Sequence, residues 1–208
     1  CEQGLFLVTG PTGSGKTTTL YALLQAVDRL ARNVVTLENP VEYRIEHVTQ
    51  TDMKATASFT FAQAVRSLLR QDPDVALIGE LRDSDTVHSA VEAALTGHLV
   101  FSSLHTSSAS GVPIRLREMG VEPYLIAHAL KGVLGQRLFL MLCGFCKRMA
   151  PLSAYESRWV AAHGGTIATT GVPVGCKACR YTGFKGQTVV AELWWCSGAA
   201  VAALLQSD

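Results

Sequence analysis

Gly10-Pro11-Thr12-Gly13-Ser14-Gly15-Lys16-Thr17 is the stretch that decides the fold class of this 208-residue chain. It fits the pattern G-x-x-x-x-G-K-[ST] at every fixed position, after an apolar run that predicts a strand and before a run that predicts a helix. The glycines let the backbone curl so that its N–H groups point at phosphate oxygens, and the helix N-terminus adds partial positive charge. The flanking pattern favours a phosphate-binding loop over a chance match in a glycine-rich turn.

Outward from this loop, short apolar runs alternate with stretches of helical periodicity from Leu5 to about Arg137. The runs are apolar on both faces, which is typical of parallel strands covered by helices: Leu5–Gly10, Val34–Leu37, Val75–Gly79 and Leu99–Ser103. The helical stretches are Lys16–Leu30, Phe59–Leu69 and Thr86–Leu95. This alternation predicts an α/β fold with an open, mostly parallel sheet and right-handed crossovers.

Beyond Gly120 the pattern changes. Pro123–Leu130 and Gly132–Leu140 are expected to be helices, followed by a cysteine-containing segment, a last strand over residues 188–195 and a short apolar helix. We therefore predict an ATPase core over residues 1–140, a small four-cysteine subdomain over 141–187, and a strand and helix over 188–208 that close onto the core.

Polar side chains follow the predicted strands where ligands bind in open parallel sheets, at the carboxyl ends. Glu38 and Glu42 follow the second strand, Glu80 follows the third, and His105 follows the fourth. Carboxylates from two neighbouring strands facing a phosphate loop suit Mg²⁺ binding and activation of water.

These positions predict a set of roles around ATP or ADP with Mg²⁺. Lys16 is expected to reach the β- and γ-phosphates, Thr17 to bind Mg²⁺ through its hydroxyl, and Glu80 to lie on the metal side. The residues expected to contact the nucleotide are Gly10, Pro11, Thr12, Gly13, Ser14, Gly15, Lys16, Thr17 and Thr18.

Two assignments stay open at this point. Glu42 and Glu38 both compete to polarise the attacking water; we favour Glu42, and one of the pair would instead fix the loop through hydrogen bonds. His105 is a candidate phosphate sensor or a polar residue near the core, whereas His98 lies about 23 Å away along an extended chain, at the other end of the strand.

The chain has six cysteines, and four of them form two C-x-x-C pairs, Cys143 with Cys146 and Cys176 with Cys179. Two such pairs supply the four thiolates of a closed tetrahedral Zn²⁺ site, which predicts a structural metal. A redox C-x-x-C is the alternative. Cys1 and Cys196 have no partner at ligand spacing and are expected to be small apolar residues.

Composition restricts the other function classes. The net charge is +1 with 17% charged residues, which argues against a dedicated nucleic-acid-binding face. The longest apolar stretches, such as Leu138–Leu142, are too short to span a membrane, so no transmembrane segment is expected. Because the chain starts at Cys1 and enters a strand at once, we expect it to lack an N-terminal portion.

The phosphate loop together with TLENPVEY (36–43), RSLLRQDPDVALIGELRD (66–83), LTGHLVFSSLHT (95–106) and GQRL (135–138) resembles the secretion-ATPase superfamily. Within it, MGVEPYLI (119–126), LCGFCK (142–147) and GCKACRYTGFKGQ (175–187) are most similar to the type II secretion ATPases, with the type IV pilus assembly ATPases second. The resemblance covers almost the whole chain.

The resemblance implies a RecA-like C-terminal domain of a cytoplasmic homo-hexamer. Such a hexamer lies at the bacterial inner membrane, beneath platform proteins, and drives pseudopilus or pilus assembly. The acidic box falls on Glu38–Glu42, the Walker B glutamate on Glu80 and the histidine box on His98 and His105, and Arg82 is implied at subunit contacts. Asn39 stands where the family usually has aspartate, so a nucleotide-binding subunit with little turnover is one rival. A DNA-acting motor is the other.

Overall fold

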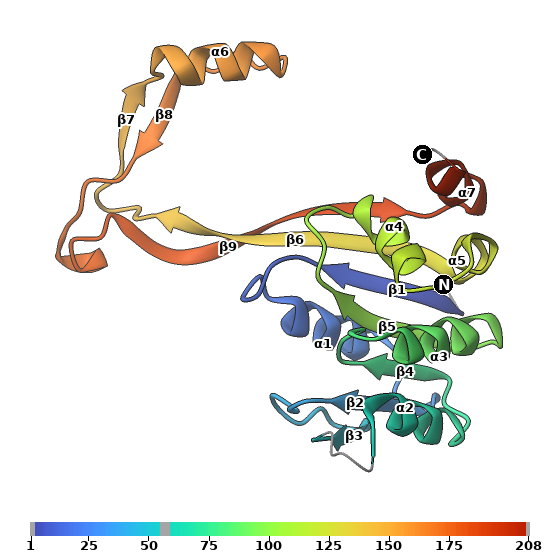
Figure 1. The fold of residues 1–208 in the computed structure, drawn as a ribbon. Helices are drawn as coiled ribbons and strands as arrows, with labels where there is room; N and C mark the ends of the chain where they lie inside the picture. Colours follow the sequence, from blue (N-terminus) through green and yellow to red (C-terminus); the bar gives the residue numbers. More distant parts are fainter. Residues whose placement is uncertain (1–2, 55–58, 207–208) are drawn as a thin grey trace. The chain divides into compact units, whose positions relative to one another are not determined.

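The computed structural model describes residues 3–54 and 59–206, so Cys1 lies outside the described part of the chain. It divides into two compact units, residues 1–137 with 191–208, and Leu138–Val190. The first unit is built on a sheet whose strand order is β3-β2-β4-β5-β1-β6-β9 (Figure 1). These strands are β1 (Gly4–Thr9), β2 (Val34–Glu38), β3 (Thr49–Asp52), β4 (Val75–Ile78), β5 (Leu99–Leu104), β6 (Leu130–Leu142) and β9 (Phe184–Trp195).

The pairs β1–β5, β1–β6, β2–β3, β2–β4 and β4–β5 are all parallel, which confirms the predicted sheet. The register pairs Thr9 with Leu104, Leu37 with Ile78, and Ile78 with Ser102. The carboxyl ends of β1, β2, β4 and β5 therefore meet at one edge of the sheet. This edge carries the phosphate loop, the segment Glu38–Glu42 (called the acidic segment below), Glu80 and His105.

Apolar side chains alternate between the two faces of this sheet and build a core on each. Val8, Val34, Leu77 and Phe101 pack with Leu20, Tyr21 and Leu24 of a single helix, α1 (Lys16–Ala26). Leu7, Leu37, Ile78 and Val100 pack on the other face with residues of five helices. The helices of this unit are α1 (Lys16–Ala26), α2 (Phe61–Leu69), α3 (Ser84–Leu95), α4 (Gly111–Glu118), α5 (Pro123–Ala129) and α7 (Gly198–Gln206).

The predicted helix over Gly132–Leu140 is wrong, because these residues belong to strand β6. A glycine inside a helix costs about 1 kcal/mol relative to alanine, and this stretch holds both Gly132 and Gly135. In the sheet the glycines make room: a Cβ on Gly132 would lie 2.6 Å from the ring of Phe6, and one on Gly135 would lie 2.8 Å from Glu192 Oε1. Close packing against both neighbouring strands selects the extended conformation.

The second unit, Leu138–Val190, has almost no apolar core. It contains the antiparallel pair β7 (Arg148–Pro151) and β8 (Thr169–Val172), helix α6 (Ala154–Ala162) and a 3₁₀ turn, η1 (Lys177–Cys179). Of its residues, all of which the structure describes, only Cys143, Cys179 and Gly183 are buried. Another interaction must therefore hold this unit together.

Candidate functional site

The loop between β1 and α1 has a backbone conformation that glycine adopts readily and other residues rarely do. Gly10, Gly13 and Gly15 have φ angles of 148°, 77° and 85°. A Cβ on Gly10 would also lie 2.2 Å from the carbonyl oxygen of Gln136, whereas a Cβ on Gly13 would meet nothing within 4 Å. Close packing therefore requires glycine at position 10, and backbone conformation alone favours it at position 13.

Lys16 opens α1, whose first N–H groups have no partner within the helix. Its ammonium donates to the carbonyl oxygens of Gly10 (2.9 Å) and Pro11 (3.1 Å) in the same loop. Burial lowers the pKa of Lys16, while the negative charge of Glu80 opposes that shift. The Ser14 hydroxyl is buried and has no hydrogen-bond partner among the described residues. A curled loop, a lysine and an unpartnered hydroxyl at a helix N-terminus fit a phosphate group.

Glu80, Arg82 and His105 form one cluster at the carboxyl edge of the sheet. The Glu80 carboxylate accepts a hydrogen bond from Arg82 Nε at 2.7 Å, and its other oxygen lies 3.1 Å from His105 Nε2. The Ser103 hydroxyl donates to Gly79 O at 2.7 Å and the Leu81 N–H donates to Ser103 O at 3.0 Å, so β4 and β5 hold both ends of this cluster in place.

Thr9, which ends β1 just before the phosphate loop, contacts the two residues on either side of His105. The Thr9 hydroxyl donates to Leu104 O at 2.9 Å and accepts from the Thr106 N–H at 2.9 Å, which fixes the end of β1 against the end of β5. His98 precedes β5, and its Nδ1 lies 2.9 Å from Ala93 O in α3. The two histidines therefore lie at opposite ends of the strand, as the sequence predicts.

The two glutamates of the acidic segment occupy different environments. Glu38 is buried and accepts hydrogen bonds from Thr36 Oγ1 (2.5 Å), from Gln50 Nε2 (3.3 Å) and from the Tyr21 hydroxyl. Burial and the hydrogen bond to Glu38 raise the pKa of Tyr21 to about 12, so at neutral pH the phenol keeps its proton and donates. The Glu42 side chain is exposed instead.

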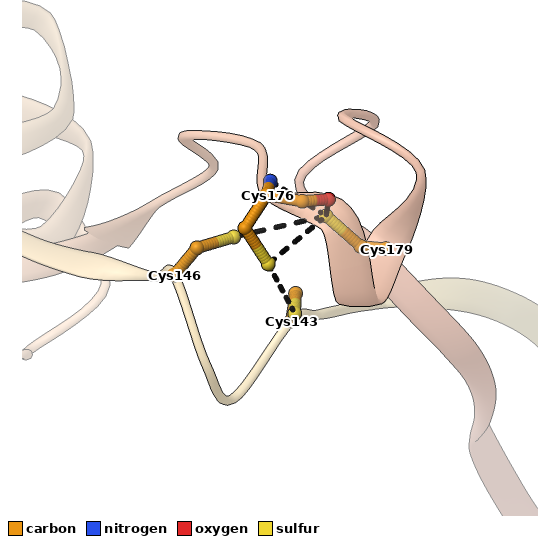
Figure 2. A group of neighbouring side chains, drawn as sticks. All are labelled: Cys143, Cys146, Cys176 and Cys179. Carbon is orange, nitrogen blue, oxygen red and sulfur yellow. Dashed lines mark hydrogen bonds between the residues drawn. The ribbon is translucent and has the colours of Figure 1, made fainter.

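Four cysteine sulfurs from separate parts of the second unit converge (Figure 2). The Sγ atoms of Cys143, Cys146, Cys176 and Cys179 all lie within 4.8 Å of one another. The Cys143–Cys176, Cys146–Cys179 and Cys176–Cys179 sulfur pairs are 4.0, 3.8 and 3.9 Å apart. Tetrahedral zinc with Zn–S bonds of about 2.3 Å places its sulfurs about 3.8 Å apart. This arrangement fits a zinc ion and has none of the direct sulfur–sulfur bonds of a disulfide.

Backbone N–H groups support these sulfurs. Cys179 Sγ accepts from the N–H groups of Cys176 (3.2 Å) and Gly183 (3.3 Å), and Cys146 Sγ accepts from that of Gly175 (3.3 Å). Burial would raise the pKa of the Cys179 thiol, but hydrogen bonds from the Cys176 and Gly183 N–H groups and from the Cys146 and Cys176 side chains together lower the pKa to about 6. Burial and the other three cysteines instead raise the pKa of Cys146 to about 11. Backbone N–H donors stabilise thiolates, which is the form that binds metal.

A known family matches the chain over its whole described length. The family described as "Type II/IV secretion system protein" matches residues 1–207. The chain belongs to this family.

Relatives within the type II/IV secretion family agree with the resemblance seen in the sequence. The chain is 47% identical to the putative type II secretion system protein E of Escherichia coli K12 over 191 residues, which cover 92% of this chain and 39% of that protein. It is 48% identical to the type II secretion system protein E of Klebsiella pneumoniae, over 92% of this chain and 38% of that protein. The chain thus spans about two fifths of the length of these relatives.

A solved structure confirms the fold of a secretion-family ATPase. The crystal structure of the pilus retraction motor PilT with bound ADP superposes with a TM-score of 0.70 at 28% identity, over 98% of this chain and 50% of that one. The RecA-like expectation for the core is thereby confirmed. Among the described residues, no helix combines the length and apolar character needed to cross a bilayer.

Sequence reasoning missed two residues that brace the site of this secretion-family chain. Gln136, buried on β6, donates from Nε2 to Ser14 O at 2.6 Å and accepts from the Thr19 hydroxyl at 2.8 Å, which ties β6 to the phosphate loop and α1. Glu192 on β9 accepts from the Ala109 N–H at 2.5 Å and so holds the segment after His105. The GQRL motif pointed to Gln136, but the helix expected over Gly132–Leu140 did not place its side chain beside the loop.

Proposed function

We propose that this chain is the ATP-hydrolysing part of a type II secretion motor, which drives pseudopilus assembly and protein export across the outer membrane. The observation that carries the proposal is the placement of Lys16, Glu80 and His105 at one edge of the sheet, where the Glu80 carboxylate lies 3.1 Å from His105 Nε2. Relatives at 46–48% identity are type II secretion proteins, which supports secretion as the system.

Each residue has a distinct role in this proposal. The loop Gly10–Thr18 binds the phosphates of Mg·ATP, Lys16 moves from its loop carbonyls to the β- and γ-phosphate oxygens, and Thr17 contacts Mg²⁺. Glu80 lies on the metal side, while Arg82 and His105 orient its carboxylate and face the γ-phosphate. Glu42, the exposed member of its pair, polarises the attacking water, since the carboxylate of Glu38 is occupied by three donors.

The surroundings of the motor are part of the same proposal. The family membership supports a homo-hexamer on the cytoplasmic side of a bacterial inner membrane, in contact with platform proteins. The four cysteines hold a structural Zn²⁺, because a closed set of four thiolates leaves no position for substrate.

Replacing Lys16 with alanine in the full-length protein will reduce steady-state phosphate release from Mg·ATP about 100-fold or more, since it removes the cation that meets the developing charge on the phosphates. Lys54→Ala, a lysine outside the site, serves as the matched control. Phosphate release and binding of a fluorescent ATP analogue are measured together. The hydrolytic role is refuted if the full-length protein binds Mg·ATP but releases no phosphate, or if Lys16→Ala turns over as fast as Lys54→Ala.

The biological system is tested separately, in a bacterium that lacks its own copy of the gene. Complementation with the full-length protein is expected to restore secretion of exoproteins and not surface pili. Restored pili without secretion would favour type IV pilus extension instead.

A further inference from the structure

Tyr21 is a buried polar residue for which the family resemblance and the proposed roles give no task. It lies on α1, the helix whose N-terminus forms the phosphate site, five residues after Lys16 and so about 7.5 Å further along the axis. Its side chain is fully buried, and its ring meets that of Tyr43 edge-on with centroids 4.7 Å apart. A fully buried tyrosine is stable only where its hydroxyl forms hydrogen bonds.

The Tyr21 hydroxyl has three hydrogen-bond partners, which use its one donor and both of its acceptor positions. It donates to the Glu38 carboxylate, and it accepts from the Glu42 N–H at 3.2 Å and from Gln50 Nε2 at 3.5 Å. A hydroxyl has one donor and two acceptor positions, so three partners fix its orientation. Because Glu38 is itself held by Thr36 and Gln50, the hydroxyl is anchored to the sheet.

Hydrogen bonds with Tyr21 and Gln50 fix the acidic segment and the residues just after it at several positions. Gln50 on β3 accepts from the Ile45 N–H at 2.7 Å and donates to Tyr43 O at 3.1 Å, which fixes the residues just after the acidic segment. Within the described ranges 3–54 and 59–206, the Tyr21 hydroxyl is the hydrogen-bond partner of the Glu42 backbone. Helix α1, whose N-terminus forms the phosphate site, is therefore connected to the Glu42 backbone through the Tyr21 hydroxyl.

We propose that Tyr21 is a positioning residue for ATP hydrolysis: its hydroxyl fixes the Glu42 backbone relative to α1, so that the Glu42 carboxylate faces the γ-phosphate held at the N-terminus of the same helix. This inference rests on the proposed function and deepens it. Tyr21 touches no substrate and acts through Glu42. Glu38 serves as the buried acceptor that keeps the hydroxyl aimed, and this use explains why the segment carries two glutamates with different environments.

Tyr21→Phe in the full-length protein keeps the ring and removes only the hydroxyl. We expect kcat to fall about 10-fold with KM for Mg·ATP nearly unchanged, because misplacing a catalytic group by about 1 Å costs up to 10²-fold while the phosphate loop stays intact. Tyr43→Phe is the matched control, since its hydroxyl has no hydrogen bond within the part of the chain that the structure describes, and it should leave kcat unchanged.

A double-mutant cycle separates positioning from general stability. If Tyr21 acts through Glu42, Tyr21→Phe combined with Glu42→Gln will turn over as slowly as Glu42→Gln alone in single-turnover phosphate release. Multiplied losses in the double variant would overturn the inference, as would an unchanged kcat in Tyr21→Phe. A Glu42→Gln variant that keeps full activity would instead overturn the proposed role of Glu42, so the two failures can be told apart.

Rescue provides the second arm, which also applies if Tyr21→Phe folds poorly. 4-Aminophenylalanine at position 21 keeps a donor to Glu38 and a lone pair towards the Glu42 N–H. It is expected to recover several-fold of the kcat lost in Tyr21→Phe. The positioning role is wrong if the 4-aminophenylalanine variant folds normally by circular dichroism but its kcat is equal to or below that of Tyr21→Phe.

Discussion

Glu42→Gln is expected to lower kcat for ATP hydrolysis by the full-length protein about 100-fold or more, with nucleotide affinity changed only a few-fold. The reason is that a general base contributes typically 10²–10⁴-fold, whereas the phosphate loop that binds the nucleotide stays intact. Because Glu42 is exposed, the same substitution should leave the midpoint of thermal unfolding almost unchanged.

Glu38→Gln is the matched comparison and should mainly lower stability, with kcat falling no more than the roughly 10-fold expected for Tyr21→Phe, because Glu38 aims the Tyr21 hydroxyl. An amide in place of this buried carboxylate directs an NH₂ group at donors such as Thr36 and Tyr21. A mismatch of this kind costs about 1–3 kcal/mol, and hence a fall of several degrees in the unfolding midpoint. Phosphate release and differential scanning fluorimetry on both variants test the assignment. Loss of catalysis in Glu38→Gln with full activity in Glu42→Gln would reverse it.

Removing the metal from the four cysteines is expected to unfold the unit Leu138–Val190 while the core stays folded. This unit buries only Cys143, Cys179 and Gly183, so it lacks the apolar core that holds an ordinary domain. A structural zinc site supplies about 10–16 kcal/mol in model peptides, which is comparable to the total stability of a typical domain.

Zinc content and limited trypsin digestion measure this effect together, since the unit offers basic residues such as Lys147, Lys177 and Lys185 for cleavage. Cys176→Ser should lose the metal and become cleaved rapidly between residues 138 and 190. The control, Cys196→Ser, should keep both metal and resistance, because Cys196 is not part of the cluster. Complete removal of zinc by a chelator with an unchanged digestion pattern would refute the structural role.

The phosphate loop and the parallel sheet could be predicted because their signals are local. Residues 10–17 carry a fixed motif between a strand and a helix, and apolar runs such as Val75–Gly79 have few alternatives to a buried strand. The separation of His98 from His105 could also be predicted, because the extended strand β5 lies between them. The four-cysteine cluster could be found from the spacing of its residues.

The remaining features depend on contacts between distant segments. Strand β6 was missed because its apolar spacing also suits a helix, and only the pairing with β1 and the close approach of Phe6 to Gly132 select the strand. Strand β3 is polar in sequence and gains its place by pairing with β2. The difference between Glu38 and Glu42 could not be predicted either, since it arises from Tyr21, 17 residues from Glu38 in sequence, and from Gln50 on β3.

The most direct measurement is a structure of the full-length protein with Mg²⁺ and a non-hydrolysable ATP analogue. The account predicts the triphosphate in the loop Gly10–Thr17, Mg²⁺ beside Thr17 and Glu80, and the Glu42 carboxylate facing the γ-phosphate with the Tyr21 hydroxyl still on its backbone N–H. A triphosphate bound in that loop with Glu80 and Glu42 both turned away from it would contradict the account.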